Sequence, residues 1–185
     1  MSEQHKSVYK SGADDGFILG AYLSVWFLLL GYSTENVYLA PLAMLMMLGV
    51  PVLIFFMLRR AYVRAYGLSQ FSELWLQGII TFVCGTLLIG VVAYVFLRYL
   101  NPGFIMNQAS VAAGYYASLP GQEARSVAHA LQVMIDRNML PEPIYVVFQM
   151  ILLGVFSGSM LSMVATWIVR RIKVRSRLDD ITPGD

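Results

Sequence analysis

Long apolar stretches alternate with shorter polar ones along the 185 residues of the chain. Four of the apolar stretches are long enough for a helix that crosses a membrane, which takes about 20 residues. They cover about 16–32, 37–58, 74–99 and 144–169, and no charged residue lies in their central parts. Because the hydrocarbon core holds no water to bind exposed backbone groups, each stretch is predicted to be a helix.

The polar segments between these spans predict how the helices are connected. Only residues 33–36 separate the first two spans, which indicates an antiparallel hairpin. The segment over about 101–143 is longer, and its residues 123–137 place apolar side chains on one face and polar ones on the other. Such amphipathic spacing predicts a helix that lies on the membrane or against the bundle.

The predicted fold is therefore all-α, an integral membrane four-helix bundle that forms a single membrane domain over 1–185. An extracytoplasmic amphipathic helical segment lies between the third and fourth membrane helices. Pro51 falls near the middle of the second span, where its missing backbone N–H should kink the helix. Gly67 is expected to end that helix, and Ser69 or Ser72 to cap the next one.

Basic residues predict the orientation of the bundle. With the N-terminus in the cytoplasm, the inner lysines and arginines are Lys6, Lys10, Arg59, Arg60, Arg64, Arg170, Arg171, Lys173, Arg175 and Arg177, and the outer ones are Arg98, Arg125 and Arg137. This positive-inside bias indicates a multi-pass protein of a bacterial inner membrane with both termini in the cytoplasm. Acidic residues before the first span, such as Glu3, argue against a cleavable signal peptide. The first helix is therefore expected to remain as an anchor.

Composition narrows the classes of partner. Hydrophobic residues make up 58% of the chain and charged residues 13%, whereas a soluble domain carries about 25% charged residues. The lipid bilayer is therefore the expected environment, and a net charge of +2 does not favour nucleic acid. Cys84 is the only cysteine, which excludes an intrachain disulfide. We expect no cofactor.

The basic sequence RRIKVRSRLDD follows the fourth span and opens a cytoplasmic tail over 170–185. Basic side chains beside a membrane attract anionic lipid headgroups, each contributing about 1 kcal/mol near the surface. Anionic lipid is therefore an expected partner of this tail, and a cytoplasmic protein is the alternative.

Small residues recur mostly every four positions in the first and last spans. The first series is Gly12, Gly16, Gly20 and Ser24, and the second is Gly154, Gly158, Ser162 and Ala165. Glycine-rich nucleotide-binding loops follow a strand, and a P-loop needs a lysine; neither feature is present. Small residues on one face instead let two membrane helices approach closely. The two series predict that the first and last helices pack against each other or across a dimer.

Asp14 and Asp15 lie between the first two glycines of the first series. Ser11 and Asp14 have the spacing of a capping box, and carboxylates suit the positive end of a helix. On a helix, Asp14 points away from the glycines and Asp15 flanks them. The alternative is a functional acidic site that includes Glu73, although a metal ion usually takes three or more oxygen ligands. No metal site is expected.

Three polar residues elsewhere are candidates for function. Gln149 lies inside the fourth span, where an amide either bonds across helices or lines a pore. His129 and Asp136 are seven residues apart on the predicted outer helix, and therefore on one face. Because this pair lacks a nucleophile or a second metal ligand, a solvated helix face is the favoured interpretation and a catalytic pair the alternative.

Three features together resemble a known family. They are the glycine-spaced first helix, the stretch YGLSQFSELWLQG at 66–78 and the stretch GVFSGSMLSMVATWIVRR at 154–171. The chain resembles domain-of-unknown-function family 4199, small four-helix membrane proteins of Bacteroidota. The residues that fit its pattern are Gly67, Ser69, Phe71, Trp75 and Gly78. The resemblance implies a fold and a membrane location, and it implies no catalytic residues.

Three hypotheses for function follow. The favoured one is a non-enzymatic integral membrane subunit or accessory protein of the cell envelope that packs with itself or with an envelope protein. The alternative is a small transporter or channel that acts as an oligomer and uses Gln149, the serines of the fourth helix and Pro51. The third is a lipid-modifying enzyme with an outer site around His129 and Asp136.

Overall fold

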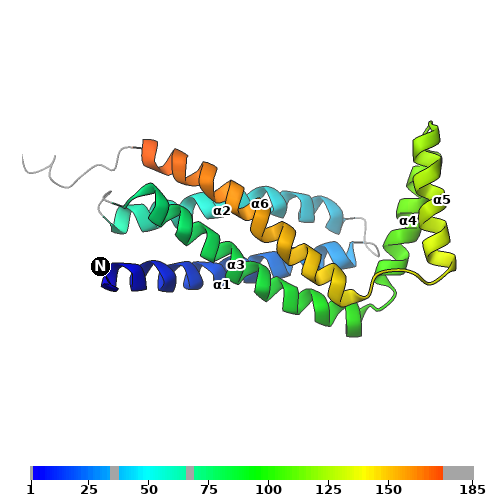
Figure 1. Ribbon diagram of the computed structural model, residues 1–185, viewed down its shortest axis with the longest axis horizontal. Helices are drawn as coiled ribbons and strands as arrows, with labels where there is room; N and C mark the ends of the chain where they lie inside the picture. The colour runs from blue at the N-terminus through cyan, green and yellow to red at the C-terminus, as the bar shows by residue number, and fades with distance from the viewer. Residues whose placement is uncertain (1, 34–37, 66–68, 173–185) are drawn as a thin grey trace, which may run out of the picture. The chain divides into compact units, whose positions relative to one another are not determined.

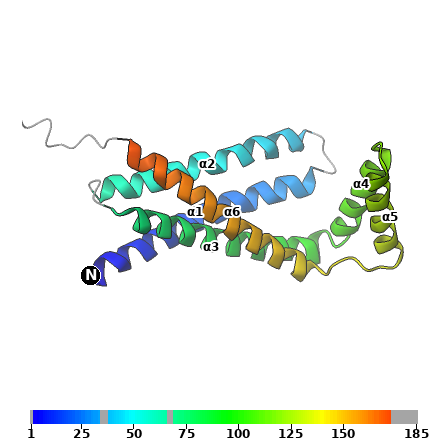
Figure 2. The ribbon, with the colours of Figure 1, turned by 45° about the horizontal axis from the view of Figure 1, so that its top comes forward.

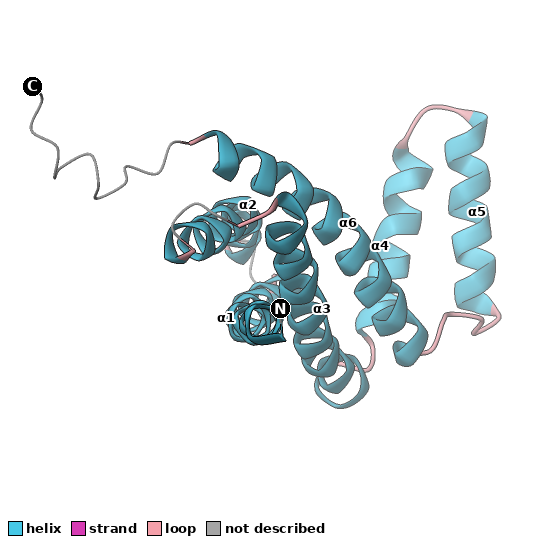
Figure 3. Ribbon diagram, turned by 60° about the vertical axis from the view of Figure 1, so that its left-hand side comes forward, coloured by secondary structure: helices cyan, strands magenta, loops and turns pink. Residues whose placement is uncertain are grey.

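The computed structural model describes residues 2–33, 38–65 and 69–172, and this part of the chain consists of helices joined by loops and turns (Figures 1 and 3). The elements in chain order are α1 (Ser2–Tyr32), α2 (Leu39–Arg64), α3 (Phe71–Val95), the π-helix η1 (Phe96–Leu100), α4 (Phe104–Ser118), α5 (Gln122–Asp136) and α6 (Pro143–Arg171). The predicted all-α fold is confirmed.

Within the described residues, four helices are long and apolar enough to cross a membrane. They are Val8–Tyr32, Leu39–Arg64, Phe71–Leu100 and Pro143–Arg171. The prediction of four membrane helices is therefore confirmed, and three of the predicted spans begin within a few residues of the observed helices. The first differs, because α1 already begins at Ser2. Ser11 and Asp14 consequently lie inside α1, and their interpretation as a capping box at its start is wrong.

The chain forms two compact units, the first made of Met1–Ile89 with Ile151–Asp185 and the second of Gly90–Met150. In the first unit, α1, α2, α3 and α6 run side by side (Figures 1 and 2). All four helices contribute to its core, which consists of Leu19, Ile54, Leu58, Phe82, Ala165 and Val169. Whether 1–185 acts as a single membrane domain stays a prediction.

The third membrane helix is the most enclosed of the four. In its most apolar stretch 44% of the residues are buried, compared with 11% for α6. The start of α3 is capped by Glu73, whose carboxylate accepts a hydrogen bond of 3.2 Å from the backbone N–H of Gln70. This is the side-chain half of a capping box, and it differs from the serine cap predicted at Ser69 or Ser72.

In the second unit α4 and α5 form a helical hairpin (Figures 1 and 3). The turn before α5 contains Gly121, whose φ of 135° is reached easily only by glycine. After α5, Asn138 adopts a φ of 53° while the N–H of Met139 bonds the carbonyl of Met134 at 2.9 Å. This is a Schellman ending with asparagine in the left-handed position. The amphipathic helix predicted over 123–137 corresponds to α5.

The helix α4 was not predicted from the sequence. Residues 104–118 contain no charged residue and no clear apolar face, so the pattern between the third span and α5 does not distinguish a helix from a loop. Ala113 is the buried residue of α4 and Ala128 that of α5. Small side chains at these points let the two helices approach closely. The predicted outer segment therefore contains two helices where one was expected.

Candidate functional site

Asp15 is a buried carboxylate inside a membrane-spanning helix. Only 8% of its surface is exposed, and it lies within the Val8–Tyr32 span because α1 starts earlier than predicted. Its Oδ2 accepts a hydrogen bond of 3.1 Å from Nε2 of Gln77 on α3, and Ser11 Oγ accepts another from the same nitrogen at 3.1 Å. Gln77 is itself 4% exposed. Ionisable residues inside a membrane helix are costly, which makes Asp15 the leading candidate for function.

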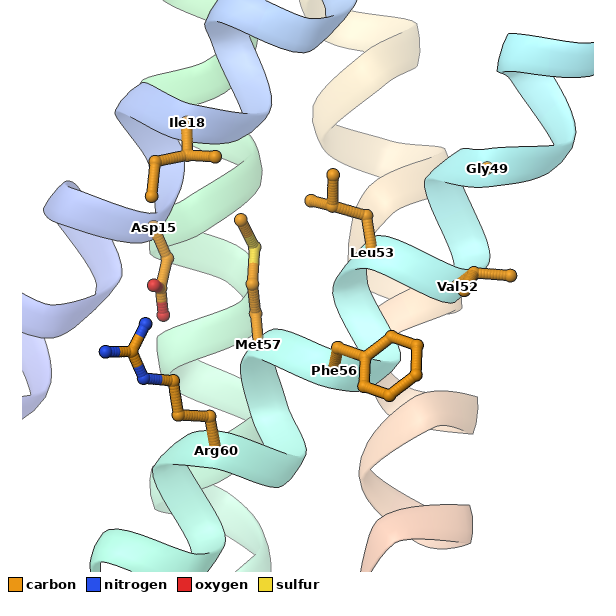
Figure 4. Close-up of a pocket in the computed structure, with 8 residues that line it drawn as sticks. All are labelled: Asp15, Ile18, Gly49, Val52, Leu53, Phe56, Met57 and Arg60. Carbon is orange, nitrogen blue, oxygen red and sulfur yellow. The ribbon is translucent and has the colours of Figure 1, made fainter.

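A pocket of about 470 Å³ lies between α1 and α2 next to this carboxylate. It is lined by Asp15, Ile18, Gly49, Val52, Leu53, Phe56, Met57 and Arg60. Figure 4 shows the carboxylate of Asp15 and the guanidinium of Arg60 turned toward each other at one end of the pocket. The remaining lining is apolar, so the pocket combines two opposite charges with a hydrophobic wall.

The pocket is open at the surface of the bundle. Ile18, Val52 and Phe56 each line it and are more than half exposed, at 51%, 53% and 58%. The pocket therefore opens on the flank of two helices that are long and apolar enough to cross a membrane.

The first series of small residues lies against α3. A Cβ added at Gly12 would meet Ile80 at 3.0 Å, and one at Gly20 would meet the carbonyl of Gly85 at 3.0 Å. Between them, a Cβ at Gly16 would lie 2.9 Å from the carbonyl of Thr81. The hydroxyl of Thr81 also donates to the carbonyl of Gly12 at 3.2 Å. Backbone contact of this kind explains why α1 needs glycine on this face.

The second series lies against α3 as well. A Cβ at Gly154 would overlap Thr86, and one at Gly158 would overlap the ring of Phe82. Ser162 fills the space beside Gly78, where an added Cβ would lie 2.6 Å from Ser162 Oγ. We expected the two series to pack against each other or across a dimer. Packing against each other is wrong for these positions, because both series contact α3. Packing across a dimer stays a prediction. The sequence period identifies which face of each helix packs, but it does not identify the neighbour.

The described part of the family-like stretch, residues 69–78, connects α3 to α6. The rings of Phe71 and Trp75 are tilted by 37° with their centroids 6.4 Å apart, and Trp75 Nε1 donates to the carbonyl of Ser159 at 3.2 Å. Ser69 is half-buried just before α3. Gly67 lies outside the described residues, and so does the stop predicted there.

Sequence reasoning missed the contact that joins α1 to α2. The hydroxyl of Tyr22 donates to the carbonyl of Met46 at 2.6 Å, and Trp26 Nε1 donates to the carbonyl of Ala43 at 3.0 Å. Gly49 makes room, because a Cβ there would overlap the Tyr22 hydroxyl. The two aromatic residues are four positions apart, so the sequence could have placed them on one face of the helix. Their partner α2 could have been inferred only from the predicted hairpin.

The other candidate residues are spread over exposed surfaces. Asp14 is exposed on α1, and Gln149 is exposed on α6. His129 and Asp136 are exposed on α5. Among the described residues, no group of three or more His, Cys, Asp or Glu is placed to hold a metal ion. The tail after Ile172, where an anionic lipid contact is predicted, lies outside the described residues.

The family described as "Protein of unknown function (DUF4199)" matches residues 14–171. No curated protein and no solved structure matches the chain. The matched range includes Asp15, the pocket and all of α6, and it confirms the resemblance drawn from the sequence. The chain therefore belongs to this family, whose function is unknown.

Proposed function

We propose that this protein is a non-enzymatic subunit or accessory protein of the cell envelope, which packs in the membrane with a second membrane protein or with a second copy of itself. The proposal places it in a bacterial inner membrane with both termini in the cytoplasm. The distribution of lysine and arginine supports that orientation, because most of them flank the cytoplasmic ends of the spans.

The observation that carries the proposal is the outer face of α6. Leu152, Phe156, Met160, Met163 and Trp167 follow one another at spacings of four, four, three and four, and each is more than half exposed. On average they lie about 180° around the helix from Gly154 and Gly158, which contact α3. Methionine and aromatic side chains adapt well to a protein surface and are enriched at protein interfaces. We call this surface the α6 stripe.

The polar side chains inside the first unit support a structural role. Thr81 donates to the carbonyl of Gln77 at 2.9 Å, and Thr86 donates to that of Phe82 at 2.7 Å. Ser24 donates to the carbonyl of Gly20 at 2.7 Å. Hydroxyls that bond a carbonyl of their own helix in this way are satisfied without a passing solute. The Thr81 hydroxyl also lies 3.2 Å from the carbonyl of Gly12, and this contact joins α3 to α1. These hydroxyls therefore do not support the hypothesis that a single copy of the chain acts as a transporter.

A photo-reactive side chain placed on the α6 stripe tests the proposal. Benzoyl-phenylalanine at Met160 is irradiated in intact cells, and the products are separated by mass. The matched control is the same side chain at Leu45 of α2, which is 68% exposed compared with 61% for Met160. We expect a discrete protein adduct at Met160 and none at Leu45. An adduct near twice 20.7 kDa identifies a second copy, and any other discrete mass identifies a different protein.

Two outcomes contradict the proposal. Lipid adducts alone at both positions mean that the α6 stripe faces only the bilayer. Protein adducts at Leu45 without any at Met160 mean that α6 is the wrong surface. Solute flux through the purified protein in liposomes, measured alongside, distinguishes a subunit from a transporter.

A further inference from the structure

We propose that the pocket between α1 and α2 binds a phospholipid whose headgroup carries both a primary ammonium and a phosphate. The ammonium lies against Asp15, the phosphate against Arg60, and the upper part of an acyl chain against the apolar wall. This site is independent of the α6 stripe, because none of its lining residues belongs to α6.

The two charges of the pocket select the headgroup. Asp15 and Arg60 are turned toward each other at the same end (Figure 4), so a ligand there meets a carboxylate and a guanidinium together. A purely anionic headgroup would bind Arg60 but would be repelled by Asp15. A zwitterionic headgroup satisfies both, since guanidinium binds phosphate strongly and a carboxylate accepts hydrogen bonds from an ammonium.

The requirement for a primary ammonium follows from the burial of Asp15. A buried carboxylate is costly unless hydrogen-bond donors compensate for the lost water. Gln77 supplies one donor to Oδ2. This contact also fixes the direction of the carboxylate, so Gln77 is a positioning residue. A primary ammonium brings three further donors, whereas a quaternary ammonium such as choline brings none.

The walls of the pocket favour a lipid over a solute from water. Ile18, Leu53 and Met57 line it with aliphatic surface, and the exposed side chain of Phe56 borders its open side. Because the pocket opens between two membrane-spanning candidates, we expect its opening to face the hydrocarbon layer. Its charged end coincides with the part of α2 that carries Arg59, Arg60 and Arg64. Basic residues of this kind gather at the level of the headgroups. A lipid therefore reaches the site with its headgroup already at the right depth.

Native mass spectrometry of the full-length protein tests the site. The protein is incubated in detergent with phosphatidylethanolamine, phosphatidylcholine or phosphatidylglycerol of identical acyl chains. We expect one phosphatidylethanolamine per chain to survive activation, with an apparent affinity about tenfold above that of phosphatidylcholine, as one or two charge-assisted hydrogen bonds provide. Equal retention of all three lipids overturns the proposal. Stronger retention of phosphatidylglycerol also overturns it, because the site would then recognise only the negative charge of the headgroup.

Two neighbouring arginines provide the matched variants. Arg60→Gln removes the guanidinium of the pocket, while Arg59→Gln changes an exposed arginine that does not line it. Both side chains are exposed, so neither change is expected to prevent folding. We expect Arg60→Gln to weaken the retention of phosphatidylethanolamine about tenfold, because the phosphate loses its guanidinium partner, and Arg59→Gln to leave that retention unchanged. Equal loss in the two variants, or retention in both, overturns the assignment. In Asp15→Asn the difference between phosphatidylethanolamine and phosphatidylcholine should disappear, and a folded variant that keeps it contradicts the role of Asp15.

Discussion

Tyr22 of α1 donates a hydrogen bond of 2.6 Å to the backbone carbonyl of Met46 in α2. The contact lies in the turn of α2 that precedes Pro51, which has no backbone N–H to offer to the carbonyl of Met47 four residues earlier. Trp26 makes a second bond of the same kind to Ala43, one turn away. Two aromatic side chains of α1 therefore hold the half of α2 before the proline, and α2 continues as one helix through Pro51.

Replacing Tyr22 by phenylalanine should weaken the bundle. The ring remains, but the hydroxyl that bonds the Met46 carbonyl is lost, and we expect the free energy of unfolding to fall by about 1 kcal/mol. Titration of the protein in mixed micelles with a denaturing detergent measures this change. Tyr38→Phe is the matched control, because Tyr38 is 90% exposed and its hydroxyl should contribute little. Equal effects of the two substitutions would contradict the role given to Tyr22.

The glycine at 158 should tolerate no larger side chain. In Gly158→Ala the new Cβ overlaps the ring of Phe82 on α3, and overpacking of this kind costs about 1–3 kcal/mol. Gly114→Ala in α4 is the control, because no atom lies within 4 Å of the added Cβ. Alanine favours a helix over glycine by about 1 kcal/mol, so that variant should be as stable as the parent or more stable. Thermal unfolding in detergent compares the two.

If Gly158→Ala leaves the unfolding temperature unchanged, then α6 does not approach α3 as closely as the structure places it. The same comparison at Gly16, whose added Cβ would meet the backbone of Thr81, tests the face between α1 and α3.

Sequence pattern predicted the four membrane helices, the helix at 123–137 and the faces that carry small residues. These features depend on the spacing of apolar and small residues along a single helix, and a membrane helix repeats that spacing over many residues. The partner of each face could not be predicted in the same way. Gln77 and Asp15 are 62 positions apart, and no local period relates them. The start of α1 was misplaced because residues 2–15 are polar, although they continue the helix.

The candidate site illustrates the same limit. Asp15 was identified from the sequence as the aspartate beside the glycines, but its burial follows from the presence of α3 and α2 around it. Arg60 was predicted only as a charge that sets orientation. Its position opposite Asp15 depends on the register of α1 against α2, which the hydrogen bonds of Tyr22 and Trp26 accompany. The sequence pattern identifies each of these residues separately, but it does not show that helix packing places them side by side.

The amide of Gln77 should matter more than that of Gln149. Gln77→Leu leaves the buried carboxylate of Asp15 without its donor, and an unsatisfied buried group of this kind costs about 1–3 kcal/mol. Gln149 is exposed on α6, so Gln149→Leu should leave stability unchanged. Titration with denaturing detergent measures both variants. Solute flux that is lost in Gln149→Leu alone would contradict this assignment and would favour the transporter hypothesis.

Two threonines that differ in their hydrogen bonds should respond in opposite directions to valine. Thr81 bonds the carbonyls of Gly12 and Gln77, so Thr81→Val should lower the free energy of unfolding by about 1 kcal/mol. The hydroxyl of Thr166 is fully buried without a partner among the described residues. Valine has nearly the same shape as threonine and lacks the hydroxyl that has no hydrogen-bond partner. Thr166→Val should therefore leave the free energy of unfolding unchanged or raise it. Both threonines are buried in the first unit, so the two substitutions are matched for burial. A loss of stability in Thr166→Val comparable to that in Thr81→Val would mean that the Thr166 hydroxyl has a partner in the membrane.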